Sequence, residues 1–159
     1  MLLLKQTDPN LSSVIRNVGC FFRSSQVIAE LICQNNLNAK QINEMWDWAK
    51  GKGYIDERNF MRASAPIINH TIKVLTGEES VNKKVFEVGT FKDGKLEYYK
   101  SVPPSMRHVD YLIQKIKTKY AAGTHFRVVD EKGHVIYDPD PRIESLGVFY
   151  SIIYCVVAS

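Results

Sequence analysis

The chain has 159 residues, of which 45% are hydrophobic and 24% charged. This composition is ordinary for a globular protein, and the length predicts a single domain over residues 1–159. The 21 basic and 17 acidic residues leave a net charge of +4, too weak to indicate a polyanionic partner. Because zinc-ligand spacing, phosphate-binding glycine loops and RNA-recognition motifs are not found, we expect no metal, no cofactor and no specific nucleic-acid partner.

The cysteine count and the apolar segments bear on localisation. Cys20, Cys33 and Cys155 are an odd and sparse set that does not suggest a disulfide framework. The apolar start, residues 1–4, is too short for the core of a signal peptide, and the run at 148–158 is well below the ~20 residues that span a bilayer. The sequence favours a reduced, cytoplasmic protein without a membrane span, and leaves its oligomeric state open.

Three helices are expected in the first half of the chain. Near-helical spacing of apolar residues predicts the first helix from Gly19-Cys20 to about residue 35. Asn38 is a favourable N-cap for the second, which places Ile42, Met45, Trp46 and Ala49 on one face and stops at residues 51–53. Pro66 suits the first turn of the third helix, which ends before Gly77.

The second half is expected to contain strands and one more helix. A hairpin over residues 84–101 turns at residues 92–95, and a helix over 105–120 carries Lys115, Lys117 and Lys119 at its solvated end. A second hairpin over 123–139 and a final strand near 147–157 follow. The predicted fold class is α+β, with an N-terminal helical layer packed on a C-terminal antiparallel sheet.

The second hairpin brings together a histidine and a carboxylate. If Asp130 pairs with Gly133 across the turn, His125 lies opposite Asp138. If the turn is the three-residue form with a bulge, the register moves by one and the two residues remain neighbours. Because opposed Cβ atoms are about 4.5–5.5 Å apart, the carboxylate can orient the imidazole.

Cys20 is the best-placed nucleophile. A thiol reacts as its thiolate, which a helix N-terminus and a neighbouring imidazolium both favour. Cys33 and Cys155 have neither advantage. Alone, Cys20 is more simply a small buried hydrophobe, but with His125 and Asp138 it completes a nucleophile, base and orienting group.

The remaining histidines give weaker signals. His70 lies beside an apolar stripe and is expected to be structural or exposed. His134 falls at the hairpin turn and is expected to face solvent. His108 starts the expected fourth helix and has no nearby partner in sequence.

These residues resemble a known pattern. The sequence resembles the papain-like cysteine peptidase superfamily at these positions, in this order: Gln6, Gly19-Cys20, His125-Phe126, Gly133 and Asp138-Pro139. The resemblance spans about residues 6–140 and is closest to the small bacterial branch that includes the double-glycine leader peptidases of bacteriocin exporters. A weaker similarity is to small members carried by phages and prophages. The resemblance implies a papain-like fold.

The resemblance also implies roles for individual residues. Cys20 would attack an acyl carbon, His125 would transfer the proton, and Asp138 would fix the imidazole tautomer. The backbone amide of Cys20 and the side chain of Gln6 would form the oxyanion hole, with Asn17 as the alternative donor. Where the family has a small residue after the cysteine, this chain has Phe21-Phe22.

Three functions fit this pattern. The first is a cysteine hydrolase that cleaves a peptide or isopeptide amide of a peptide or protein substrate through a thioester. The second is an acyltransferase of the transglutaminase or arylamine acetyltransferase kind, with the same triad. The third is a catalytically silent papain-like binding protein, for which Phe21-Phe22 and Trp48 could supply a contact surface.

Overall fold

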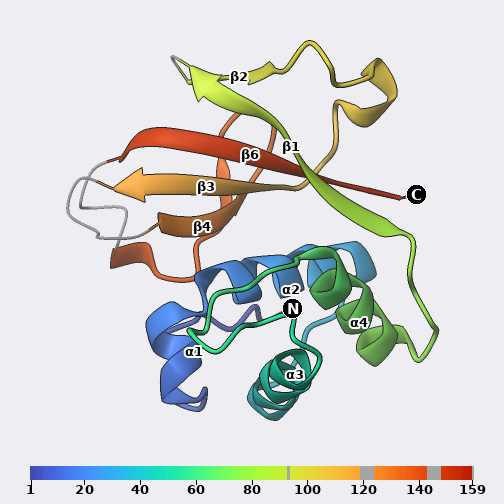
Figure 1. The fold of residues 1–159 in the computed structure, drawn as a ribbon, viewed down its shortest axis with the longest axis vertical. Helices are drawn as coiled ribbons and strands as arrows, with labels where there is room; N and C mark the ends of the chain where they lie inside the picture. Colours follow the sequence, from blue (N-terminus) through green and yellow to red (C-terminus); the bar gives the residue numbers. More distant parts are fainter. Residues whose placement is uncertain (93, 119–123, 143–147, 159) are drawn as a thin grey trace.

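In the computed structural model, which describes residues 1–92, 94–118, 124–142 and 148–158, a helical half precedes a sheet half (Figure 1). The helices are α1 (Ser13–Val18), α2 (Cys20–Cys33), α3 (Ala39–Gly51), α4 (Ala65–Thr76) and the short 3₁₀ helix η1 (Pro104–Met106). The strands are β1 (Lys83–Lys92), β2 (Lys95–Tyr98), β3 (Leu112–Thr118), β4 (Thr124–Val129), β5 (Val135–Tyr137) and β6 (Val148–Ala158).

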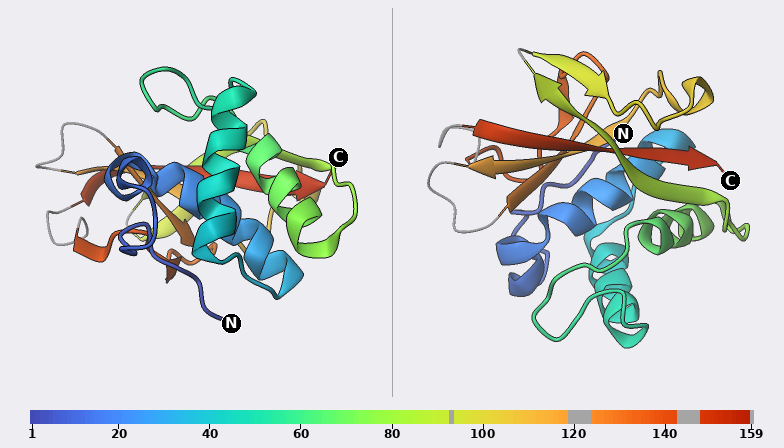
Figure 2. Two further views of the ribbon diagram at one scale, coloured as in Figure 1. Left: turned by 90° about the horizontal axis from the view of Figure 1, so that it is seen from below. Right: turned by 45° about the horizontal axis from the view of Figure 1, so that its top comes forward.

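The six strands form one antiparallel sheet with the order β2-β1-β6-β3-β4-β5. The last strand of the chain, β6, lies in the middle of this order, between β1 and β3. Figures 1 and 2 show the helices gathered on one side of the sheet, with α2 and α4 next to it and α3 farther away. The predicted α+β class is confirmed, with the helical layer α1–α4 N-terminal to the sheet.

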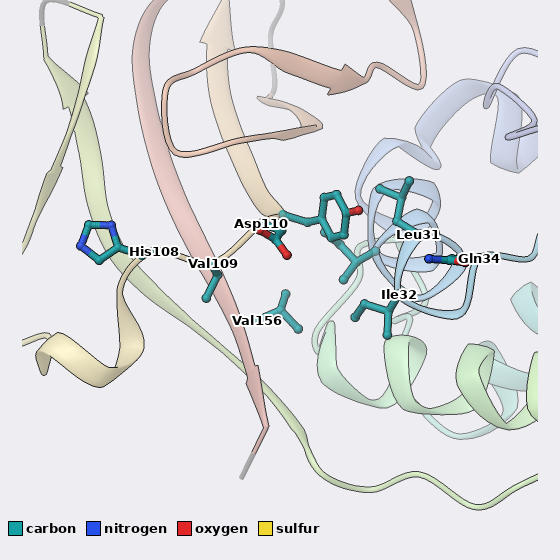
Figure 3. A pocket seen from close by; sticks show the side chains of 9 residues that line it. Leu31, Ile32, Gln34, His108, Val109, Asp110 and Val156 are labelled. Atoms are coloured by element: carbon teal, nitrogen blue, oxygen red, sulfur yellow. The ribbon is translucent and has the colours of Figure 1, made fainter.

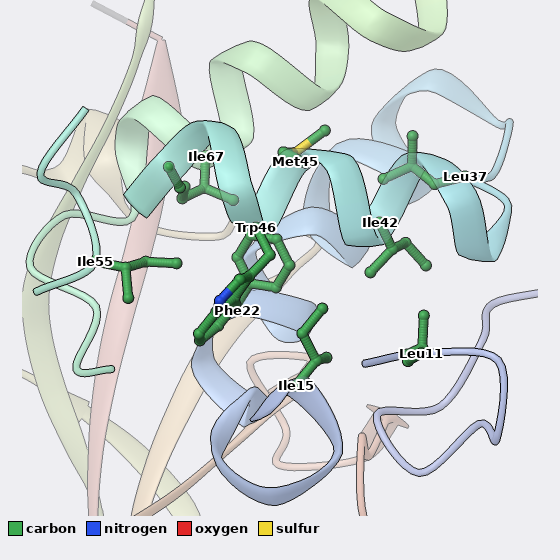
Figure 4. Close-up of a cluster of buried hydrophobic side chains, with 10 residues drawn as sticks. Leu11, Ile15, Phe22, Leu37, Ile42, Met45, Trp46, Ile55 and Ile67 are labelled. Atoms are coloured by element: carbon green, nitrogen blue, oxygen red, sulfur yellow. The ribbon is translucent and has the colours of Figure 1, made fainter. Parts of the chain in front are cut away.

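A buried cluster between α1, α2, α3 and α4 holds the helical layer together (Figure 4). Phe22 of α2 packs edge-on against Trp46 of α3, with ring centroids 5.1 Å apart. The predicted apolar face of α3 is confirmed, because all four of its residues are buried: Ile42, Met45, Trp46 and Ala49. Such a stripe stabilises a helix only when a neighbouring element covers it.

The predicted ends of the three helices are also confirmed. Asn38 and Gln41 form a reciprocal capping box at the start of α3, with both hydrogen bonds at 2.9 Å. Pro66 lies in the first turn of α4, and Gly77 caps its end in the left-handed conformation, with φ of 76°. The helix α1, which is only six residues long, was not among the predicted helices.

The far side of the sheet has its own apolar cluster. Val88, Leu112, Val129, Ile153 and Cys155 are buried there. The partly buried side chains packed on them include Met106 of η1 and residues of the predicted β1–β2 hairpin. That hairpin is confirmed by the pairing of Lys92 with Lys95, while residue 93 of its turn lies outside the described residues.

The predicted helix over 105–120 is wrong. Among the described residues of this segment, only 105 and 106 are helical, as part of η1. Residues 112–118 form β3, which pairs with β4 on one edge and β6 on the other. Two ladders of long-range hydrogen bonds outweigh the local helical pattern. Lys115 and Lys117 are therefore strand residues, not a helix end, and Lys119 lies outside the described residues. The final strand is confirmed as β6, although residue 147 is not described.

His108 also differs from its expectation. It does not start a helix but adopts a left-handed backbone conformation with φ of 61°. Its Nδ1 lies 2.9 Å from Oε2 of Glu131 in the β4–β5 turn. A partner distant in sequence therefore exists, which local sequence could not reveal. His134 is exposed as expected, and pairs with Asp130 of the same turn.

Candidate active site

Cys20 is the first residue of α2, directly after the short α1. Gly19, between the two helices, donates its backbone N–H to Ile15 at 2.8 Å. A Cβ on Gly19 would stand 2.5 Å from the carbonyl oxygen of Ile15, so only glycine fits this junction. The junction fixes where the unpaired amides of the α2 N-terminus, and the thiol of Cys20, point.

The N-terminus of α2 is attached to the start of β4. The Cys20 thiol contacts the carbonyl oxygen of Thr124 at 4.0 Å. The next residue, Phe21, stacks on Phe126 with ring centroids 4.0 Å apart and an interplanar angle of 6°. One turn later, the Ser24 hydroxyl donates to the carbonyl of Phe126 at 3.1 Å. These contacts place Cys20 beside the strand that carries the histidine.

Phe21 and Phe22 therefore have packing partners on opposite sides of α2. Phe21 stacks on Phe126, and Phe22 packs on Trp46 in the helical cluster. Trp48, the other aromatic residue proposed as a contact surface, is half-buried and stacks on His70, with ring centroids 3.7 Å apart. His70 is thus structural, as expected, and burial lowers its pKa.

His125 and Asp138, expected to be neighbours across the hairpin, are hydrogen-bonded to each other and buried. His125 Nε2 lies 2.7 Å from Asp138 Oδ1, and the two residues are 4% and 5% exposed. Burial by itself would lower the pKa of His125. The hydrogen bonds to Asp138 and to the Cys20 thiol outweigh it and raise the pKa to about 9. His125 therefore contacts Asp138 and Cys20 at once, as an imidazolium at neutral pH.

The hairpin itself has the bulged form of the two expected registers. Gly133, with φ of 83°, donates its N–H to Asp130, while Asp130 donates to the carbonyl of His134. The ladder then pairs Val129 with Val135 and Val128 with Tyr137. A further residue is inserted between these two pairs, so His125 and Asp138 meet through their side chains and not as a register pair.

Residues that the sequence analysis did not single out surround Asp138. The backbone N–H of Asp140 donates to Asp138 Oδ1 at 3.0 Å, and Lys5 Nζ donates to the Asp138 carbonyl at 2.8 Å. Arg127 Nη1 lies 3.9 Å from Asp138 Oδ2. Period-two alternation along β4 puts Arg127 on the same face as His125, which is a signal the sequence contains. Lys5 and Asp140 carry no such signal.

Gln6 is brought to the same region. It is 3% exposed, its N–H donates to the carbonyl of Pro139 at 3.0 Å, and its side-chain amide donates to the carbonyl of Arg16 at 3.0 Å. It therefore bridges the residue after Asp138 and the end of α1. Asn17, the alternative, is exposed on α1.

A buried network holds the N-terminal segment that carries Gln6. Arg23 and Glu30 of α2 are fully buried and form an ion pair at 2.8 Å. Arg23 also donates to the carbonyl of Leu4 through Nε at 3.2 Å and Nη2 at 2.9 Å, and the Tyr137 hydroxyl donates to the same carbonyl at 2.7 Å. Burial raises the pKa of Glu30, against the opposing effect of Arg23.

The other two cysteines have different surroundings. Cys155 is buried in the sheet, and burial raises its pKa to about 11. Burial likewise raises the pKa of Cys33, at the end of α2. Both shifts disfavour the thiolate. Cys20 is the cysteine that contacts a histidine in the described part of the chain.

A pocket of about 460 Å³ lies at the opposite end of α2 (Figure 3). Leu31 and Ile32 line one side, and Val109, Asp110 and Val156 line the other. Because α2 has 14 residues, this pocket is about 20 Å along the helix from Cys20 and is separate from the His125 site.

Within residues 1–92, 94–118, 124–142 and 148–158, no group of three or more His, Cys, Asp or Glu side chains is arranged to hold a metal ion. None of the helices in these described segments has both the length and the apolar character needed to cross a bilayer.

Fold and site together define an α+β protein in which a thiol at a helix N-terminus contacts a strand histidine that is hydrogen-bonded to an aspartate. The chain matches the family described as "Protein of unknown function, DUF261" over residues 1–149, and it belongs to this family. Neither the curated proteins nor the solved structures gave a match to it.

Proposed function

We propose that this protein is a cysteine hydrolase of papain-like type that cleaves a peptide or isopeptide amide through a thioester. The observation that carries the proposal is the contact of one buried imidazole, His125, with both the Cys20 thiol and the Asp138 carboxylate. A thiol, a base and an orienting carboxylate in this order are what nucleophilic acyl chemistry requires.

The geometry assigns a role to each ring nitrogen. Nε2 of His125 is hydrogen-bonded to Asp138, so Nδ1 is the nitrogen that holds the proton taken from Cys20 in the thiolate–imidazolium pair. The Cys20 sulfur then forms a bond to the acyl carbon, and the amine leaves with the proton that His125 returns to it. Water, deprotonated by His125, cleaves the thioester to release the acid and restores the thiol.

Two donors are proposed for the oxyanion. The backbone N–H of Cys20 lies in the first turn of α2, where helix amides have no partner within the helix. Gln6 uses one of its two side-chain N–H groups for Arg16, so the second can serve a substrate oxygen. Losing one such donor typically costs about 2.7–4 kcal/mol of transition-state stabilisation. Burial of Gln6 favours it over Asn17, because a buried donor is held in one orientation.

The arrangement of elements supports the papain-like assignment. The thiol is at the N-terminus of α2, which packs against the antiparallel sheet, and the histidine and aspartate come from β4 and the residue after β5. This order of a helix with cysteine followed by strands with histidine and aspartate is the one that the sequence resemblance implies.

The proposal is tested by site-specific alkylation. Full-length protein is treated with iodoacetamide at pH 7, and the modification rate of each cysteine is followed by peptide mass spectrometry. We expect Cys20 to react fastest, and His125→Ala to slow it by about tenfold or more, since the imidazolium that favours the thiolate is lost. His134→Ala, which removes an exposed histidine, is the matched control. Equal reactivity of Cys20 and Cys33, or an unchanged rate in His125→Ala, would contradict the proposal.

A further inference from the structure

A polar pocket of about 360 Å³ is lined by residues of α1 and by neighbours in sequence of the candidate active site. Five of the described residues line it: Thr7, Ser13, Arg16, Asn17 and Arg142. They combine two guanidinium groups, two hydroxyls and an amide, and none of the five is acidic. Such side chains are donors that match the oxygens of a carboxylate.

Covalent neighbours and hydrogen bonds connect this pocket to the site. Thr7 follows Gln6, and the Gln6 amide donates to the carbonyl of Arg16. Arg142 is bound to Asp140, whose backbone N–H donates to the carboxylate of Asp138. The pocket is therefore connected to the proposed oxyanion donor through Thr7 and Arg16, and to the residue that orients His125 through Arg142 and Asp140.

The charge of the pocket is positive. Asp140 holds Arg142 through two hydrogen bonds of 2.8 Å, which fix its guanidinium in place and neutralise its charge. Arg16, in the last turn of α1 and exposed, then supplies the net positive charge. The fixed guanidinium of Arg142 can orient a bound anion, and the exposed guanidinium of Arg16 can attract it.

We propose that this pocket binds a carboxylate of the substrate, so that the enzyme selects an acidic residue or a free C-terminus next to the scissile bond. The proposal deepens the hydrolase assignment and rests on it. A peptide carboxylate placed between Arg16 and Arg142, with Thr7 or Ser13 donating to it, would hold the neighbouring amide near Cys20.

The test measures binding without chemistry. The ¹⁵N-labelled Cys20→Ala protein is titrated with N-acetyl-glutamate amide, N-acetyl-glutamine carrying a free carboxylate, and neutral N-acetyl-glutamine amide. We expect at least one charged probe to bind about tenfold more tightly than the neutral probe, with shifts at the amides of Thr7, Ser13 and Asn17. The first probe reports a side-chain carboxylate, and the second reports a C-terminal one.

Arg16→Gln in the same background should bring the charged probe within about twofold of the neutral one. Arg58→Gln, which removes an exposed arginine on the loop between α3 and α4, should leave the preference intact. Equal binding of all three probes, or equal effects of the two substitutions, would overturn the inference. Alkylation of the wild-type protein separates the two proposals. A reactive Cys20 without carboxylate preference refutes only the pocket, and an inert Cys20 with the preference refutes only the hydrolase.

Discussion

His125 Nε2 and Asp138 Oδ1 are 2.7 Å apart, although these residues are not paired in the β4–β5 ladder. Asp138 follows the last residue of β5, and the chain there is fixed by the N-terminal segment. Lys5 donates to the Asp138 carbonyl, and Gln6 donates to the carbonyl of Pro139. The N-terminal segment, distant in sequence, therefore sets the position of the carboxylate that orients the imidazole.

The first prediction concerns Asp138→Asn. The hydrogen bond to the carboxylate raises the pKa of His125, so the substitution should lower that pKa from about 9. Once the pKa of His125 lies below 7, each further unit by which it falls reduces the imidazolium fraction at pH 7 by about tenfold. Alkylation of Cys20 should slow by the same factor. NMR titration of His125 and the iodoacetamide rate measure the two effects. Asp130→Asn, which removes the partner of the exposed His134, should change neither quantity.

The second prediction concerns the pH dependence of stability. The pKa of His125 is raised from 6.5 to about 9 in the folded state. Its contribution to the free energy of unfolding is therefore fully present below pH 6.5, and is lost as pH rises through 9. At about 1.4 kcal/mol per pKa unit, the loss is on the order of 3 kcal/mol. Urea unfolding at pH 6, 7.5 and 9.5 measures it. If the free energy of unfolding changes with pH in the same way in the wild type and in His125→Gln, His125 is not the source of the pH dependence.

The third prediction concerns Gly19→Ala. The new Cβ would meet the Ile15 carbonyl oxygen at 2.5 Å and Ile15 Cγ2 at 2.8 Å, so the α1–α2 junction must shift. We expect a loss of about 1–3 kcal/mol in stability and a slower reaction of Cys20. Gly51→Ala is the control, since nothing lies within 4 Å of its Cβ position and alanine favours a helix. Similar denaturation midpoints for the two variants would show that the junction is not tight.

The fourth prediction concerns the buried pair of Arg23 and Glu30. Arg23→Ala leaves a carboxylate buried without its partner and should cost about 3–5 kcal/mol of unfolding free energy. The double variant Arg23→Met/Glu30→Leu removes both charges and should recover much of that loss. Chemical denaturation of the three proteins measures these differences. If the double variant is as unstable as the single one, the contacts of Arg23 with Leu4 dominate over its charge.

Part of the fold and of the candidate site can be predicted from the sequence, because the patterns that indicate it are local. The cap at Asn38, the stop at Gly77 and the periodic apolar faces are short-range patterns, and the helices form where they predict. The turn at residues 130–133 joins His125 and Asp138 within 14 residues, so a hairpin of either register brings them together. In the segment predicted as a helix over 105–120, Lys115 and Lys117 alternate with the buried residues Gln114 and Ile116, which is the period of a strand.

The sequence by itself determined the helices α2, α3 and α4, the β4–β5 hairpin and the candidate residues Cys20, His125 and Asp138, since each depends on caps, turns or spacing over a few residues. Only the tertiary structure decided that residues 112–118 form a central strand, because its partners β4 and β6 supply the hydrogen bonds. It also decided that Gln6 reaches Pro139, through bonds across more than a hundred residues. Such contacts depend on the packing of the whole chain, which no local pattern encodes.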